Sequence, residues 1–196
     1  MNKSKSVFMS IFVLSGMLFI LFTGDVSISA QSSDKRITDI RKIYDETNGL
    51  VAEMEKHPDL STIFVVELVV NKYLSPYPAV GIYQSTATFY YTYGNREKDP
   101  YPNRLLKIVV ELKRAANNGK FEYLFDPSGD LIFAFTKPDG TDTVEQRSYF
   151  SSRKLIKLTE DGKDRDAKNK DATEAGAVAK REAARLVGIF KASLRE

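Results

Sequence analysis

The sequence predicts an α+β fold: an antiparallel β-meander of about seven strands, with an N-terminal and a C-terminal helix packed on it. Apolar residues recur at helical spacing near both ends of the chain, and β-branched and aromatic runs fill residues 62–159 between them. Short turn signals such as Asn118-Gly119 and Asp126-Pro127-Ser128-Gly129 separate these runs. Strands joined so briefly must be antiparallel neighbours.

The first segment has the pattern of an export signal. Lys3 and Lys5 precede an apolar run from Val7 to Phe22, and small residues follow as far as Ala30. The run is shorter than the ~20 residues of a typical membrane-spanning helix. We therefore expect a signal peptide over 1–30, cleaved after Ala30, and one α+β domain over 31–196. The alternative is an uncleaved segment that anchors the protein to a membrane by its N-terminus.

The domain begins with a helix over residues 34–56. Its apolar residues fall three and four positions apart, at Ile37, Ile40, Tyr44, Thr47, Val51 and Met54. His57-Pro58 ends this helix, because proline disfavours helical geometry in the residue before it.

Three strands are predicted in the first half of the sheet. Residues 62–74 are apolar on both alternating faces, which is typical of a central strand covered on two sides. Residues 81–93 place most of their tyrosines on one face. Residues 104–114 alternate as a half-buried strand does, with Lys107 among the residues that point away from the apolar side.

Two aromatic hairpins follow, over residues 121–135 and 147–158. In the first, Phe121, Tyr123 and Phe125 share one strand face, and Leu131, Phe133 and Phe135 also share one. We expect these two sets to form a continuous apolar side of the hairpin, which belongs in the core.

The two hairpins carry a resemblance to known proteins. It depends on residues of the aromatic, turn and Leu-Ile pattern: Tyr123, Phe125, Asp126, Gly129, Leu131, Ile132, then Tyr149, Phe150, Leu155 and Ile156. Hairpins of this kind resemble those of uncharacterised exported bacterial envelope proteins that have an N-terminal helix. The second hairpin lacks the glycine and has a shorter turn. The resemblance implies a way of building the sheet and no particular activity.

The last part of the chain changes in composition. Residues 160–172 alternate charges with almost no apolar side chain, so we expect a charged flexible loop inside the domain. A helix over 173–194 follows. Its apolar face favours docking on the sheet, and the alternative is a basic helix lying on a membrane surface.

Catalytic and metal-binding motifs are missing from the sequence. The chain has no cysteine and one histidine, His57, so we expect no Cys-His pair, no zinc site and no Ser-His-Asp triad. We predict a non-enzyme without cofactor or metal. A hydrolase with paired carboxylates stays open, because the fold sets their spacing. The 29 basic and 26 acidic residues are too balanced to indicate a nucleic-acid partner.

Tyrosines are concentrated before the first hairpin: seven of the ten lie between residues 73 and 101. Strand packing is their ordinary role, and Tyr91, Tyr93, Arg96 and Tyr101 are the candidate binding residues, because they lie in or beside the polar loop 94–102.

Two functional hypotheses follow from these features. The first is a non-catalytic exported protein, periplasmic or secreted, that binds an envelope protein, a peptide or a glycan through its sheet and the 94–102 loop. The alternative is a carrier that holds a small apolar ligand between the sheet and a helix.

Overall fold

A computed structural model describes residues 25–78, 81–93, 104–115, 118–139 and 143–194. The chain divides into two compact units, Met1–Arg36 and Ile37–Glu196. The described part of the first unit is the beginning of helix α1, and every contact discussed below lies within the second. The predicted signal sequence, as far as residue 24, lies outside the described residues.

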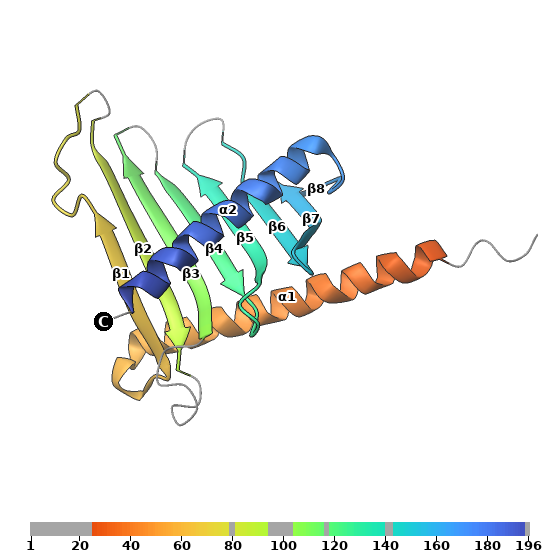
Figure 1. Ribbon diagram of the computed structural model, residues 1–196, viewed down its shortest axis with the longest axis horizontal. Helices are drawn as coiled ribbons and strands as arrows, with labels where there is room; N and C mark the ends of the chain where they lie inside the picture. The colour runs from red at the N-terminus through yellow and green to blue at the C-terminus, as the bar shows by residue number, and fades with distance from the viewer. Residues whose placement is uncertain (1–24, 79–80, 94–103, 116–117, 140–142, 195–196) are drawn as a thin grey trace, which may run out of the picture. The chain divides into compact units, whose positions relative to one another are not determined.

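The described residues form two long helices, one short 3-10 helix and eight strands (Figure 1). The helices are α1 (Asp25–Lys56), η1 (Pro58–Leu60) and α2 (Lys170–Ser193). The strands are β1 (Ile63–Val70), β2 (Tyr83–Thr92), β3 (Arg104–Arg114), β4 (Gly119–Phe125), β5 (Leu131–Pro138), β6 (Gln146–Ser151), β7 (Lys154–Glu160) and β8 (Lys163–Arg165). Neither long helix contains, in its described residues, an apolar stretch long enough to cross a membrane.

The strands form one sheet in the order β1-β2-β3-β4-β5-β6-β7-β8, and each pairs antiparallel with its neighbour. The predicted α+β meander with a helix at each end is therefore confirmed. The additional strand, β8, lies within residues 160–172, where the sequence predicts a loop. Positive φ angles at Asp161 and Gly162 form a tight turn, and an ion pair of 2.8 Å joins Lys157 to Asp164. Asp-Gly is the sequence signal for this hairpin turn.

Helix α2 and the part of α1 from Ile37 onward cover opposite faces of the sheet. Helix α2 runs diagonally across one face (Figure 1) and packs on a cluster of buried residues that we call the α2 cluster. Its members are Ala87, Phe89, Tyr91, Ile108, Val110, Tyr123, Phe125, Ala134, Phe150, Ala183, Leu186 and Phe190. The α1 cluster is Ile37, Ile40, Leu124, Ile132, Phe133 and Tyr149. Tyr123 and Leu124 are adjacent but belong to different clusters, because successive side chains of a strand point to opposite faces.

Strand β1 lies at the edge of the sheet, so the prediction of a central strand over residues 62–74 is wrong. Among the described strands β1 pairs with β2 alone. Its apolar residues on both faces indicated cover from two sides, whereas Val65, Leu68 and Val70 are each about 40% exposed.

The first aromatic hairpin, β4 and β5, has apolar residues on both sides of the sheet. Tyr123 pairs with Ala134 and Leu124 with Phe133. Because paired residues share a face, Tyr123 packs under α2 while Phe133 packs under α1. The expected continuous apolar side is therefore wrong: Phe133 and Phe135 fall on the face opposite to Phe121, Tyr123 and Phe125. Leu131 alone of its set stays on the α2 face, because the register shifts between Leu124 and Phe125.

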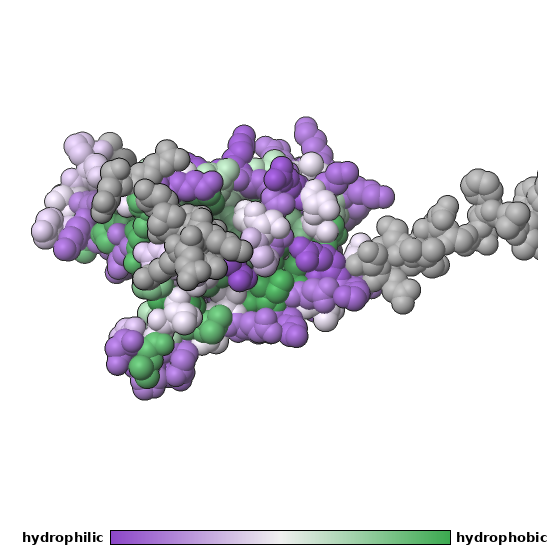
Figure 2. Space-filling view, turned by 60° about the horizontal axis from the view of Figure 1, so that its bottom comes forward, coloured by the Kyte–Doolittle hydropathy of each residue, from purple (hydrophilic) through white to green (hydrophobic). Residues whose placement is uncertain are grey.

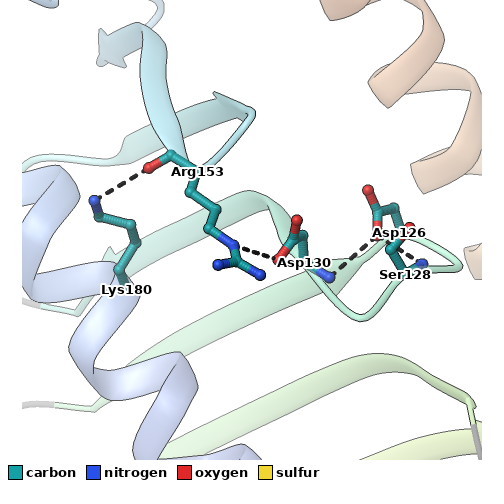
Figure 3. A network of polar contacts seen from close by, with 5 residues as sticks. All are labelled: Asp126, Ser128, Asp130, Arg153 and Lys180. Atoms are coloured by element: carbon teal, nitrogen blue, oxygen red, sulfur yellow. Dashed lines mark hydrogen bonds and ion pairs between the residues drawn. The ribbon is translucent and has the colours of Figure 1, made fainter.

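The turns of the two aromatic hairpins are joined by polar contacts (Figure 3). In the first turn, the carboxylate of Asp126 accepts hydrogen bonds from the N–H groups of Ser128 and Asp130. In the second, Ser152 and Arg153 both have positive φ, so a two-residue turn forms without glycine. The guanidinium of Arg153 lies 2.9 Å from Asp130, and Lys180 of α2 donates to the Arg153 carbonyl. These contacts hold an arginine in a conformation that glycine usually occupies.

Both helices extend further than the sequence predicts at their N-terminal ends. Helix α1 is continuous across Ala30, the predicted cleavage position, and cleavage there stays a prediction. Helix α2 begins at Lys170, because the side chain of Asn169 accepts a hydrogen bond from the N–H of Asp171 and caps the first turn.

Candidate functional site

A groove of about 530 Å³ lies between α1 and strands β4, β5 and β6. Its apolar lining is mainly aromatic: Tyr44 from the helix and Phe133, Phe135 and Tyr149 from the sheet. The ring of Phe133 has its centroid 5.1 Å from that of Tyr44 and 5.1 Å from that of Tyr149. We call this cavity the aromatic groove. Figure 2 shows hydrophobic surface bordered by hydrophilic side chains on the face that its view brings forward.

Basic side chains surround the aromatic lining. Four of them, Arg41, Lys120, Lys137 and Arg147, line the groove, together with the acids Asp45 and Glu122. Lys120 pairs with Glu122, and Arg147 pairs with Glu145. The guanidinium of Arg41 lies 5.8 Å from the ring centroid of Tyr149, and that of Arg147 lies 5.6 Å from the ring centroid of Phe135.

Two of these cations, Arg41 and Lys137, have no ion pair with any residue of the described ranges. The four cations of the lining therefore outnumber its two acids along the edge of an aromatic surface. An anionic group that entered the groove would find these two cations available.

A buried ion pair supports one wall of the groove. Lys107 of β3 and Glu122 of β4 are 6% and 4% exposed, and their Nζ and Oε2 atoms are 2.8 Å apart. Glu122 also accepts a hydrogen bond of 2.7 Å from the Tyr44 hydroxyl, and its other oxygen lies 2.8 Å from Lys120. Lys107 donates a further hydrogen bond to Asn48. The pair therefore ties helix α1 to the sheet.

The environment of this pair fixes its protonation. Burial raises the pKa of Glu122, but the donors Lys107, Lys120 and Tyr44 outweigh it and bring that pKa to about 2. Burial, reinforced by the neighbouring Glu122, raises the pKa of Tyr44 to about 12. Burial also lowers the pKa of Lys107, while Glu122 opposes this effect. Glu122 is thus ionised at neutral pH, whereas a general acid needs a pKa near the working pH.

The sequence-predicted site residues lie elsewhere. Tyr91 is buried and packs on Phe190 of α2, with ring centroids 5.2 Å apart. Tyr93 is half-buried against Phe64, at 4.4 Å. Arg96, Tyr101 and the 94–102 loop lie outside the described residues. Tyr91 and Tyr93 therefore have the packing role considered for them, and the binding role of all four stays a prediction.

The residues of the aromatic groove were missed at the sequence level. The sequence places Tyr44 on an apolar helix face and predicts that Lys107 points away from the covered side of its strand. In the structure Lys107 is covered, which corrects that interpretation. The available signal was Lys107 itself, a charge inside a strand whose other face is fully apolar, but only the register and the position of α1 identify its partners.

No group of three or more metal-ligating carboxylates or histidines occurs among the described residues. Comparisons with protein-family models, with curated proteins and with solved structures found no match to this chain.

Proposed function

We propose that the protein is a non-catalytic binding protein that holds a small anionic ligand with an apolar or planar body in the aromatic groove. The observation that carries this proposal is the aromatic lining flanked by two cations, Arg41 and Lys137, without ion pairs to described residues. It develops the second sequence-based hypothesis, a carrier between sheet and helix, and adds a negative charge to the ligand.

The size and chemistry of the groove support this class of ligand. A volume of about 530 Å³ is within the range of roughly 300–1,000 Å³ common for small-molecule sites. Aromatic faces stack on planar or apolar bodies. The guanidinium of Arg41 offers a planar pair of donors to a carboxylate, sulfonate or phosphate, and Lys137 adds a point charge.

The protonation states of Glu122 and Tyr44 support binding rather than catalysis. Glu122 already accepts from three donors and holds no proton at neutral pH. Tyr44 keeps its proton, since its pKa is about 12. Neither group is prepared to exchange a proton with a substrate at neutral pH. Their role in the proposal is to hold α1 at the distance from the sheet that leaves the groove open.

Export, and a periplasmic or secreted location, enter the proposal from the sequence pattern of residues 1–30. An envelope protein, a peptide or a glycan that binds the sheet and the 94–102 loop is the first sequence-based hypothesis, and it is compatible with a ligand in the groove.

A matched pair of fluorescent probes tests the proposal. Anilinonaphthalene sulfonate carries an anion on the ring system of neutral phenylnaphthylamine, so comparison of their Kd values isolates the charge. We expect the sulfonate to bind about tenfold more tightly, a difference of about 1.4 kcal/mol. Arg41→Gln and Lys137→Gln should each weaken the sulfonate about fivefold and leave the neutral probe unchanged.

The control variant is Lys191→Gln, which removes a cation from α2 on the opposite face. It should bind both probes as the parent does. Equal affinity for the two probes, or equal loss in all three variants, would contradict the assignment of an anion to the groove. Native mass spectrometry of protein purified from its own source gives a second readout, because a retained ligand adds a defined mass.

A further inference from the structure

The two edges of the sheet differ in how they meet solvent. Strand β8 spans Lys163–Arg165, and all its residues are charged and exposed. A short charged edge resists pairing with other chains. Strand β1 spans Ile63–Val70, and Glu67 is its sole charge. It has no proline or lysine, the residues that commonly protect an edge.

Three apolar side chains of β1 are also partly exposed. Val65 lies on the α1 face of the sheet, whereas Leu68 and Val70 lie on the α2 face, and their exposures are 41%, 39% and 41%. The same composition led the sequence to predict a central strand. Strand β1 has the composition of a central strand but lies at the edge of the sheet, which indicates that a further strand pairs with it.

We propose that β1 pairs with β1 of a second copy of this chain, antiparallel about a two-fold axis at Val66. The meander then continues from one copy into the other as a single sheet. The surface involved is separate from the aromatic groove, which lies over β4 to β6, so the proposal does not depend on the function proposed above.

The sequence of β1 selects this register. Paired residues of an antiparallel ladder share a face. A two-fold axis perpendicular to the sheet therefore lies midway between the two copies of one residue, and that residue faces itself across the interface. With the axis at Val66, Phe64 faces Leu68 of the copy and Ile63 faces Val69. With the axis at Glu67, two carboxylates face each other, and like charges directly opposite are destabilising. With the axis at Val65, the paired segment shortens from 63–69 to 63–67.

The sequence of β1 is self-complementary in this register and opposes no like charges, which supports a second copy as the occupant. In the register centred on Val66, Glu67 faces Val65 of the copy, and each carboxylate stays at the partly exposed α1 side of the edge. A single strand pair buries less than the roughly 1,600 Å² of a standard interface, so we expect a weak, reversible dimer.

The chain contains no cysteine, so single-cysteine variants report on proximity without background. We would oxidise Val66→Cys, Glu67→Cys and Asp164→Cys variants of the full-length chain with copper phenanthroline, in non-ionic detergent because of the apolar run 7–22. Directly opposed residues have Cα atoms about 4.5–5.5 Å apart, within disulfide range. We expect a covalent dimer from Val66→Cys and little from Glu67→Cys, although Glu67 is the more exposed residue.

Asp164→Cys on β8 controls for random collision at an exposed edge. A separate variant, Leu68→Lys, places a cation opposite Phe64 of the copy. Sedimentation velocity at 100 μM should show a dimer for the parent chain and a monomer for Leu68→Lys. Val178→Lys, at an exposed apolar position of α2, should stay dimeric.

Several results would overturn the proposal. These are a monomeric parent, equal cross-linking of the three cysteine variants, or a dimer that Leu68→Lys leaves intact. A monomeric parent is the result expected if a peptide or a segment of the same chain covers β1. Circular dichroism verifies that Leu68→Lys is folded, and the cysteine pattern gives its answer independently of that variant.

Discussion

The two faces of the sheet are formed by alternate residues of the same strands, yet they are held together differently. Under α2 lies a large hydrophobic cluster that includes the stacked rings of Phe89 and Phe190. Under α1 the hydrophobic cluster is smaller, and this side contains Lys107 and Glu122, the charged residues that are buried within the described ranges. The second face also contains the aromatic groove.

This difference teaches how an opening is kept beside a core. Burial of apolar surface is non-directional and favours complete closure of a helix on a sheet. Hydrogen bonds between buried charged groups require a fixed geometry, and the folded protein is destabilised if the partners move apart. The contacts of Tyr44, Asn48 and Lys107 therefore set the distance between α1 and strands β4 to β6. The packing of α2 instead determines the stability of the sheet as a whole.

The largest expected effect on the difference between the two faces comes from removal of one buried charge from the α1 face. Glu122→Leu leaves the ammonium of Lys107 buried beside an apolar side chain. Loss of one partner of a buried pair typically costs about 3–5 kcal/mol. We expect a loss of about 4 kcal/mol in the free energy of unfolding, measured by urea denaturation.

The double variant Lys107→Met/Glu122→Leu is the matched control. Replacement of both members of a buried pair by apolar residues is often neutral or stabilising. We expect the double variant to recover most of the lost stability, although binding of the sulfonate probe should fall because α1 is no longer fixed. A double variant as unstable as Glu122→Leu would show that the pair is not the cause.

The comparison also explains what the sequence predicts well. Helical spacing, strand alternation and turn residues are local, and they predicted the α+β meander and the bounds 104–114 of β3. The groove depends on contacts between distant segments: Tyr44 and Glu122 are 78 positions apart. Alternation indicates which residues share a face, but it does not indicate what covers that face. Lys107 and the edge position of β1 were missed for this reason.

The second prediction concerns acid. The pKa of Glu122 is about 2 in the folded protein, below its ordinary value of 4.5. Because the folded pKa is depressed, the stabilisation is present above the ordinary pKa and is lost as pH falls from about 5 to about 2. The shift corresponds to about 3 kcal/mol. Urea denaturation between pH 7 and pH 2 should show this loss in the parent, and a loss smaller by that amount in Lys107→Met/Glu122→Leu. Parallel pH profiles for the two proteins would contradict it.

The third prediction separates the hydroxyl of Tyr44 from its ring. Tyr44→Phe removes the 2.7 Å hydrogen bond to Glu122 and keeps the aromatic lining. A hydrogen bond to a charged group contributes about 1.5–3 kcal/mol, so we expect a loss of about 2 kcal/mol. The pKa of Glu122 should rise, because one of its three donors is gone, and a carboxyl NMR titration would measure this.

The control for the third prediction is Tyr149→Phe in the same groove. Its hydroxyl has no hydrogen bond with the described residues, so its removal should leave stability and the Glu122 pKa unchanged. Equal effects of the two substitutions would mean that the hydroxyl of Tyr44 has no special part in holding α1.

The smallest predicted effect compares one glycine from each helix. A Cβ at Gly49 of α1 would meet no atom within 4 Å, whereas at Gly176 of α2 it would lie 3.3 Å from the Leu155 side chain. Alanine in a helix interior gains about 1 kcal/mol over glycine. Overpacking typically costs about 1–3 kcal/mol. We expect Gly49→Ala to raise the unfolding free energy by about 1 kcal/mol and Gly176→Ala to lower it slightly, because α2 contacts the sheet too closely to admit a methyl group. Equal gains in thermal denaturation would show that α2 is packed as loosely at this point as α1 is at Gly49.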